Sequence, residues 1–322
     1  MGLEKDLVNL RRNVPLKDFT TFKIGGEANY FYIVKSKEEL IKVLKAAEKN
    51  GTPFFILGGG SNILFSDSGF KGLIIKMEMS ELKISANAVY AEAGAMLPEI
   101  AKETAKKGYG DLSWMGGIPG TLGGAVFQNA SAFGRSIADS LRTVAALDIL
   151  NGMKIKNYTA KECNFSYKKS IFKENPNLII LSAILRLKKQ PVHDAVSSLE
   201  KYINYRRAHH PLDFPSAGSV FENFLLNNEK NIKIAEEIFK KYPEIQDFSK
   251  KGFIPAGFFI EKCGLKGKRI GGAKISEKHA NFIINYDHAS ARDVLKLTDS
   301  IKKEVRKKFR IDLKEEIIAV EG

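Results

Sequence analysis

Two glycine-rich runs constrain this chain more than any other feature of its sequence. The run GGGSN at 58–62 follows the apolar stretch FFIL, and GGIPGTLGGAVFQNASAFG covers 116–134. Glycine adopts positive φ easily, and consecutive glycines let backbone N–H groups converge on phosphate oxygens. So much glycine inside a domain indicates that the backbone closely approaches another group. The two runs together predict one long ligand between them, of dinucleotide length, with a pair of tight sheet corners as the alternative.

The glycine runs do not match the common nucleotide-binding signatures. No Gly-Lys-Ser/Thr follows 58–62, which excludes a Walker loop, and the G-x-G-x-x-G spacing of dinucleotide-binding folds is missing. Ser61 and Asn62 add side-chain donors to the first run. Taken alone, however, this run is equally typical of a structural turn.

The charge of the chain favours anionic ligands. Its 322 residues include 51 Lys or Arg and 37 Asp or Glu, for a net charge of +14. Such a field attracts nucleic acid, a membrane surface or phosphorylated small molecules, although solvated lysine-rich helix faces explain it as well. The clearest basic cluster, KKEVRKKFR at 302–310, lies in a helical pattern, and no basic stripe alternates with aromatic residues as in nucleic-acid grooves.

Several classes of protein are excluded by composition. Two cysteines, Cys163 and Cys263, are too few for a disulfide framework or a four-thiolate cluster, and the five histidines show no metal-binding spacing. The first residues lack the apolar segment of a signal peptide. The uncharged window 112–134 holds six glycines and a proline, so we expect loops and tight turns rather than a membrane span. These features predict a soluble, reduced, cytoplasmic protein without a metal site.

Local patterns predict an α+β chain. We expect strands at 54–57, 73–77, 88–95, 142–150 and 178–187, and helices at 37–50, 98–107, 192–210 and 289–309. Ser36 and Glu39 form the capping-box pattern that starts the first of these helices. The helix from 192 is interpreted as a connector to a further domain, and the tail 311–320 has strand character.

Six motifs in order resemble one enzyme family. TTFKIGG, ILGGGSNIL, GGIPGTLGGAV, FSYKKSIF, PSAGSVFEN and GLKGKRIGGAKISEKHANFIIN together are similar to the UDP-N-acetylenolpyruvoylglucosamine reductases, in their shorter form. The resemblance implies an FAD-binding fold of the vanillyl-alcohol-oxidase type, made of two α/β subdomains, with a third α/β domain for substrate. We expect the first subdomain at 1–78 joined by the tail 310–322, the second at 79–190, and the connector helix with the substrate domain at 191–309.

The resemblance also implies the reaction and its cofactors. The family reduces UDP-N-acetyl-3-O-(1-carboxyvinyl)-glucosamine to UDP-N-acetylmuramate for peptidoglycan synthesis, with NADPH as donor and FAD as carrier. FAD is expected to be non-covalent, because the first histidine, His193, follows the FAD subdomains, and Cys163 is expected to be inert. The residues expected to bind FAD are Gly58, Gly59, Gly60, Ser61, Asn62, Gly117, Ile118, Gly120, Thr121, Gly123, Gly124 and Ala125.

Three catalytic residues follow from the resemblance. Ser219 matches the family's proton donor, whereas a serine after Ala-Gly is otherwise typical of a turn or cap, and Ser216 precedes the glycine and is rejected. Glu316 matches the second glutamate of a closing Leu-Glu-Pro-Glu-Val motif, here LKEEI, and an exposed tail glutamate is the alternative. Lys168 stands where the family has arginine, so the charge is kept and the planar fork is lost.

The remaining expectations concern the substrate and competing functions. Residues expected to bind substrate are Tyr167, Arg207, Asn223, Lys266 and His279. Exposed helix-end and turn residues explain Arg207 and Lys266 equally well, and His209 and His210 receive no role. We expect a monomer whose partner is the small-molecule UDP-sugar, with no nucleic acid or membrane. Another FAD oxidoreductase of this fold, or a basic RNA-binding protein, is the alternative.

Overall fold

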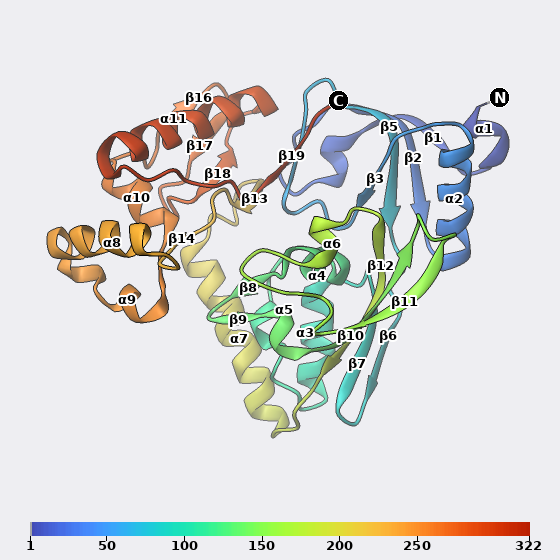
Figure 1. Cartoon of the computed structure of the whole chain (residues 1–322), viewed down its shortest axis with the longest axis horizontal. Coiled ribbons are helices and arrows are strands. Elements are labelled where there is room, and N and C mark those ends of the chain that lie inside the picture. Colours follow the sequence, from blue (N-terminus) through green and yellow to red (C-terminus); the bar gives the residue numbers. More distant parts are fainter. Residues whose placement is uncertain (1) are drawn as a thin grey trace.

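The computed structural model describes residues 2–322, and the chain forms three units (Figure 1). The first unit holds a four-stranded sheet in the order β1-β2-β5-β3, in which β2, β5 and β3 are parallel and β1 is antiparallel to β2. Its elements are α1 (Leu3–Asp6), β1 (Arg11–Pro15), β2 (Glu27–Val34), α2 (Lys37–Lys49), β3 (Phe54–Leu57), β4 (Ile63–Phe65) and β5 (Phe70–Met77).

Helix α2 begins at the predicted cap. The Ser36 hydroxyl accepts a hydrogen bond from the Glu39 N–H at 3.1 Å. The Glu39 carboxylate accepts from the N–H of Lys35 at 2.7 Å instead of from Ser36, so only half of the predicted capping box forms. The helix packs Leu40, Val43 and Leu44 into the core and connects parallel strands β2 and β3. The predicted β-α-β arrangement is therefore present.

The second unit is built on a five-stranded antiparallel sheet in the order β11-β10-β12-β7-β6. Buried residues of this sheet and of the first unit form one hydrophobic core. Its elements are β6 (Leu82–Ser85), β7 (Ala88–Glu92), α3 (Leu97–Lys106), α4 (Leu122–Gln128), β8 (Ser131–Ala132), β9 (Arg135–Ser136), α5 (Ile137–Ser140), β10 (Leu141–Asp148), β11 (Lys154–Thr159), α6 (Ile171–Glu174) and β12 (Leu178–Arg186).

The second glycine run differs from its prediction. We expected only loops and turns across 116–134, but α4 occupies Leu122–Gln128. Thr121 supplies an N-cap by accepting from the Gly124 N–H at 3.5 Å. Gly123 allows the helix to approach the sheet, because a Cβ there would lie 2.9 Å from the Cβ of Ala93. Glycine in this run therefore serves close packing of a helix as well as turns.

The third unit follows helix α7 (Val192–His209), which packs along α3 and buries Ala195 and Leu199 in the core of the first two units. It contains a four-stranded antiparallel sheet in the order β13-β18-β17-β16. Its elements are β13 (Ser216–Ser219), β14 (Phe224–Leu225), α8 (Glu229–Lys241), α9 (Asp247–Lys251), β15 (Phe253–Ile254), α10 (Ala256–Lys262), β16 (Arg269–Ile270), β17 (Ala273–Ile275), β18 (Phe282–Asn285) and α11 (Ala291–Phe309). None of the helices within residues 2–322 is both long and apolar enough to span a bilayer.

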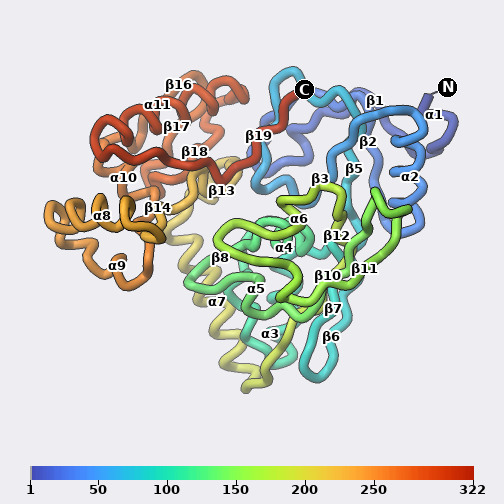
Figure 2. The backbone as a smooth tube through the Cα atoms, viewed as in Figure 1, coloured from blue at the N-terminus to red at the C-terminus, as the bar shows by residue number. Residues whose placement is uncertain are grey.

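The C-terminal tail returns to the first unit. Figure 2 follows the red end of the chain from the third unit back to the blue segments. There β19 (Ile318–Val320) pairs in parallel with β4. Phe22, Ile24 and Leu64 of the first unit are buried in the core of the third unit. The third unit is thus fixed to the first by shared apolar packing and by the tail.

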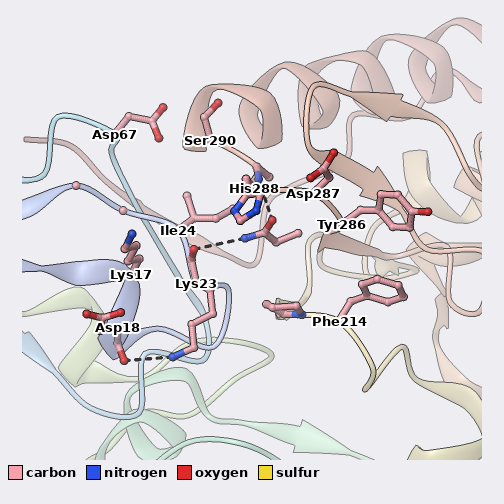
Figure 3. A pocket seen from close by; sticks show the side chains of 15 residues that line it. Lys17, Asp18, Lys23, Ile24, Asp67, Phe214, Tyr286, Asp287, His288 and Ser290 are labelled. Carbon is pink, nitrogen blue, oxygen red and sulfur yellow. Dashed lines mark hydrogen bonds between the residues drawn. The ribbon is translucent and has the colours of Figure 1, made fainter.

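Asp67 joins the first unit to helix α11. Its carboxylate accepts hydrogen bonds from the N–H groups of Ala291 and Arg292, at 2.7 and 3.1 Å. These N–H groups have no partner within the helix, and a negative charge is favourable at a helix N-terminus. The contact borders a cavity of about 730 Å³ between the two units (Figure 3). Asp67 therefore stabilises both the helix start and the position of the third unit.

Replacing Asp67 by alanine should lower the free energy of unfolding by about 1 kcal/mol, because two helix N–H groups lose their acceptor. Denaturant unfolding measures the change. Asp312→Ala is the matched control, since Asp312 pairs only with exposed Arg306 at 3.3 Å and should cost less than about 0.5 kcal/mol. Equal destabilisation by the two variants would contradict the role given to Asp67.

Candidate active site

A cavity of about 1470 Å³ is lined by residues of all three units. Both glycine runs reach it, and so do the segment that precedes β12, the end of α7 and the C-terminal tail. All twelve residues expected to bind FAD line it: Gly58, Gly59, Gly60, Ser61, Asn62, Gly117, Ile118, Gly120, Thr121, Gly123, Gly124 and Ala125. The structure thus brings the two runs into one site, as expected for a single long ligand.

The two glycine turns pack directly against each other. A Cβ on Gly59 would lie 2.8 Å from the Cα of Gly120, and one on Gly60, whose φ is +63°, would lie 2.1 Å from the carbonyl oxygen of Phe19. Side chains at these positions are therefore excluded. Lys76 steadies the first turn by donating to the Gly58 carbonyl at 2.6 Å, and burial lowers the pKa of its amine. The two turns thus form one closely packed wall of the cavity.

The TTFKIGG motif connects the first turn to the third unit. The Thr21 N–H donates to the Gly60 carbonyl at 3.1 Å, and its hydroxyl donates to the Ser216 carbonyl at 2.7 Å. Ser216 completes the pairing by donating its N–H to the Thr21 carbonyl at 3.1 Å. One threonine therefore fixes the start of β13 relative to the first glycine turn.

Ser219 and Glu316 lie on neighbouring backbone segments. The Glu316 N–H donates to the Val220 carbonyl at 2.8 Å, and Glu222 donates in the same way to Lys314 at 2.8 Å. The segment 313–317 thus runs antiparallel beside 220–222, with a bridge between Phe221 and Glu315. Ser219 immediately precedes this pairing, and both Ser219 and Glu316 line the cavity.

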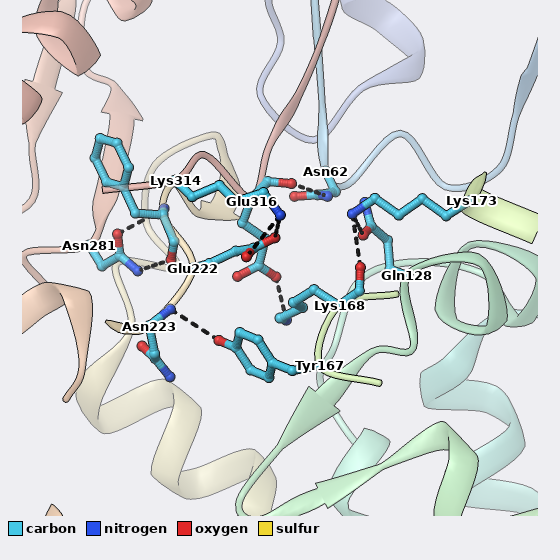
Figure 4. A network of polar contacts seen from close by, with 11 residues as sticks. Asn62, Gln128, Tyr167, Lys168, Lys173, Glu222, Asn223, Asn281, Lys314 and Glu316 are labelled. Carbon is cyan, nitrogen blue, oxygen red and sulfur yellow. Dashed lines mark hydrogen bonds and ion pairs between the residues drawn. The ribbon is translucent and has the colours of Figure 1, made fainter. Parts of the chain in front are cut away.

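Glu316 and Lys168 form an ion pair at the edge of the cavity (Figure 4). Lys168 Nζ lies 2.5 Å from Glu316 Oε1, and both side chains are largely shielded, with 9% and 18% exposed. Burial raises the pKa of Glu316, and the opposing charge of Lys168 acts to lower it. The site therefore holds a carboxylate that accepts a proton more readily than an exposed one and an ammonium group beside it.

The turn at 166–169 presents Lys168 and Tyr167 to the cavity. Lys168 has a φ of +57°, the left-handed conformation that a lysine seldom adopts. The Tyr167 oxygen accepts a hydrogen bond from the Asn223 N–H at 3.0 Å, so its own hydroxyl hydrogen is free for a ligand. Burial raises the pKa of Tyr167 to about 12, which keeps that hydroxyl protonated. Asn223 lines the cavity as well.

Of the two neighbouring arginines near the end of α7, Arg206 lines the cavity and the predicted Arg207 does not. Arg207 lies outside the cavity lining, is exposed, and has Asn204 as its side-chain partner, at 3.5 Å. Arg206 is 9% exposed, lines the cavity and lies over the Phe133 ring at 5.5 Å. Within residues 2–322 its Nε has no hydrogen-bond partner, and burial lowers its pKa to about 10. The packing of α7 on α3 decides which neighbour faces inward.

Lys266, predicted to bind substrate, lies apart from the other predicted site residues. It does not line the cavity and instead pairs with Glu261 at 3.0 Å on the surface. The His279 ring does line the cavity, and so does His210, which received no role. The two rings meet edge to face with centroids 5.4 Å apart. Burial is the main cause that lowers the pKa of each imidazole, that of His210 to about 3.

Asn281 is a further residue that the sequence analysis missed. It is 4% exposed, accepts from the Phe221 N–H at 3.0 Å and donates to the Phe221 carbonyl at 2.9 Å. Its own carbonyl accepts from Val220 at 2.8 Å. The KHANF segment therefore holds the backbone that follows Ser219. Its partner Phe221 lies 60 residues earlier in the chain, so no local pattern of the sequence indicated this role.

Cys163 is buried and is not one of the residues that line the cavity. Burial raises the pKa of its thiol to about 12, so it is protonated at neutral pH. This agrees with the inert thiol predicted from the sequence.

Two family profiles match the chain. The profile described as UDP-N-acetylenolpyruvoylglucosamine reductase, C-terminal domain, matches residues 210–320, and the profile described as FAD binding domain matches residues 28–154. These regions contain the third unit with the returning tail and the two glycine turns, respectively. The glycine turns, Ser219 and Glu316 therefore lie within the matched ranges, whereas Lys168 and Arg206 lie between them.

Individual relatives cover nearly the whole chain. The UDP-N-acetylenolpyruvoylglucosamine reductase of Caldicellulosiruptor saccharolyticus is 39% identical over 98% of this chain and 93% of its own length. The Bacillus subtilis protein of the same name is 33% identical over 99% and 96%. The crystal structure of UDP-N-acetylenolpyruvylglucosamine reductase from Thermus caldophilus is 28% identical and superposes with a TM-score of 0.73, covering 96% of this chain and 97% of that one.

Acid should destabilise the protein through His210. Its pKa is near 6.5 when unfolded and about 3 when folded, so below pH 6.5 the unfolded chain binds a proton that the folded chain does not. The free energy of unfolding should therefore fall as pH decreases from 6.5, and His210→Gln should make this decrease shallower. Denaturant titrations at pH 7.5 and 5.5 measure it. The exposed His193→Gln is the control, and an unchanged slope in His210→Gln would contradict the assignment.

Proposed function

The chain belongs to the UDP-N-acetylenolpyruvoylglucosamine reductase family, and we propose that its large cavity holds the ligands of that reaction. The protein is an FAD-dependent oxidoreductase that uses NADPH to reduce UDP-N-acetyl-3-O-(1-carboxyvinyl)-glucosamine to UDP-N-acetylmuramate in peptidoglycan synthesis. One observation carries the assignment of the site: Ser219, Glu316 and Lys168 line the same cavity as both glycine turns.

The two glycine turns are assigned to FAD. Backbone N–H groups of 58–62 hold the pyrophosphate, and residues of 117–125 lie along the flavin and its ribityl chain. Bound FAD supplies the hydride chemistry between NADPH and the UDP-sugar. FAD is assigned as non-covalently bound, because no histidine lies within the matched FAD binding domain, residues 28–154.

The substrate's chemistry explains why a lysine and a glutamate are needed. Its double bond carries a carboxylate, and addition of hydride to the terminal carbon pushes further negative charge toward that group. Lys168 stabilises this charge through a single strong contact, in a cavity where electrostatic interactions are stronger than in water. Glu316 holds Lys168 in place before the substrate binds and, as a carboxyl group with a raised pKa, can also bind the substrate in its protonated form.

Ser219 is assigned as the proton donor. A serine hydroxyl is a weak acid, but the carbon that receives the proton belongs to a strongly basic enolate-like species, so the transfer is downhill. The pairing of 313–317 with 220–222 brings the backbone at Ser219 close to that at Glu316, which supports this assignment. Asn281 keeps the following backbone fixed by its hydrogen bonds to Phe221.

Arg206 is assigned to a phosphate group of a ligand in the cavity. A buried guanidinium without an acidic partner is costly, and a bound anion removes that cost. The net charge of +14 supports ligands that are all polyanions, namely FAD, NADPH and the UDP-sugar. We propose further that the enzyme acts in the cytoplasm as a monomer, without nucleic acid or membrane partners.

Purified protein should be yellow, with flavin absorbance at ~450 nm, and colourless protein that retains RNA would refute the proposed function.

The Ser219→Ala variant should separate the two half-reactions of the enzyme. The variant should keep the rate at which NADPH reduces the flavin. Oxidation of reduced flavin by the UDP-sugar should slow by about 100-fold or more, because the proton donor is lost. Anaerobic stopped-flow absorbance measures both rates. An equal decrease in the rates of both half-reactions would refute the role of Ser219.

Neighbouring arginines of α7 provide a matched pair of variants. Arg206→Met should weaken binding of UDP-N-acetylglucosamine or NADPH by about 10-fold or more, because a charge-assisted hydrogen bond to phosphate is lost. Arg207→Met should change both dissociation constants by less than about twofold, since Arg207 lies outside the cavity. Titrations followed by flavin absorbance give these constants. A larger effect of Arg207→Met would restore the original assignment.

A further inference from the structure

Three hydrogen bonds join the segment 166–173 to the C-terminal end of α4. The Ser170 hydroxyl donates to the Phe127 carbonyl at 2.7 Å, and the Asn129 amide donates to the Ser166 carbonyl at 2.8 Å. The third bond runs from Lys173 Nζ to Gln128 Oε1 at 2.8 Å. Only this third contact involves a charged side chain, and Figure 4 shows it beside the Lys168–Glu316 pair.

Lys173 has a second acceptor that matters for Lys168. Its Nζ donates to the Lys168 carbonyl at 3.0 Å. Lys168 has a φ of +57°, a conformation that costs a non-glycine residue free energy and persists only where the surroundings hold it. The ammonium group of Lys173 therefore supports the turn from which Lys168 reaches Glu316.

The bond to Gln128 decides which way its amide faces. A lysine ammonium only donates, so it selects the amide oxygen, and the amide nitrogen must point elsewhere. Gln128 is 8% exposed and lines the large cavity, and within residues 2–322 its Nε2 has no hydrogen-bond partner. A buried donor left without an acceptor is costly, which indicates that a bound ligand supplies the acceptor.

The surrounding charges favour a negatively charged acceptor. Lys168 pairs with Glu316, and Lys314 pairs with Glu222 at 3.0 Å. Lys173 has no carboxylate within 4 Å among the described residues, although the charges of Glu222 and Glu316 act on it. In the polar network of Figure 4, three ammonium groups therefore lie near two carboxylates, and Lys173 is the ammonium group without a direct carboxylate partner among the described residues.

We propose that Lys173 is a positioning residue that fixes Gln128 so that its amide nitrogen donates to the carboxylate of the carboxyvinyl group. The same ammonium holds the Lys168 backbone, so Gln128 and Lys168 bind one carboxylate from two sides. The proposal rests on the proposed function, because it takes its ligand from that reaction. It adds a substrate contact, Gln128, and a residue that acts through it.

Two UDP-sugars separate this role from general damage to the site. UDP-N-acetylmuramate carries a carboxylate and UDP-N-acetylglucosamine lacks one, and both can be titrated by flavin absorbance with FAD-loaded protein. Lys173→Met should weaken binding of UDP-N-acetylmuramate by about 10-fold or more and that of UDP-N-acetylglucosamine by less than about twofold. Lys169→Met is the matched control, because Lys169 is an exposed lysine of the same turn, and should change neither.

Two further variants test whether Lys173 acts through its neighbours. In a Gln128→Leu background, Lys173→Met should weaken UDP-N-acetylmuramate binding by a clearly smaller factor, because the two residues share one function. Lys173→Arg keeps charge and donors and should restore most of the affinity. Three results would overturn this proposal alone. Lys173→Met could leave the affinity for UDP-N-acetylmuramate unchanged, or it could weaken the binding of both sugars equally. In the double variant, the decreases in affinity caused by the two single substitutions could multiply fully. A wild type that binds neither sugar would overturn the proposed function as well.

Discussion

The site depends on the position of Glu316, because this residue contacts all three units of the chain. Its N–H binds the Val220 carbonyl of the third unit at 2.8 Å, and its carbonyl accepts from the Asn62 amide of the first unit at 3.0 Å. Its carboxylate pairs with Lys168 of the second unit at 2.5 Å. The returning tail therefore holds the first glycine turn, the segment after Ser219 and the Lys168 side chain in fixed positions relative to one another.

This arrangement makes the electrostatics of the cavity depend on its assembly. Removing one member of a shielded ion pair leaves an uncompensated charge, which is far more costly than losing a surface pair. Lys168 and Glu316 come from segments 148 residues apart, so their contact forms only when the second unit and the tail have docked. The Lys168 ammonium group is therefore already shielded from water and held by Glu316 before a ligand carboxylate enters the cavity. A preorganised charge of this kind stabilises developing negative charge strongly.

Local signals predicted much of the fold and part of the site. Ser36 predicted the start of α2, and the glycine runs predicted a ligand site whose wall they form. Both signals are local, because helix caps and positive φ depend on a few neighbouring residues. The sequence did not distinguish Arg206 from Arg207, since adjacent helix positions differ only in which side packs on α3. The role of Asn281 depends on a segment 60 residues away and has no local signal. The family resemblance supplied Ser219, whose pattern alone is typical of a turn.

The most direct test is a crystal structure of the FAD-loaded protein with UDP-N-acetylmuramate bound. The account predicts the flavin along residues 117–125, the ligand carboxylate within hydrogen-bond distance of Lys168, and the Ser219 hydroxyl beside the carbon that receives the proton. A flavin elsewhere, or a carboxylate far from Lys168 with the Lys168–Glu316 pair untouched, would contradict the central claim that one cavity performs the reaction.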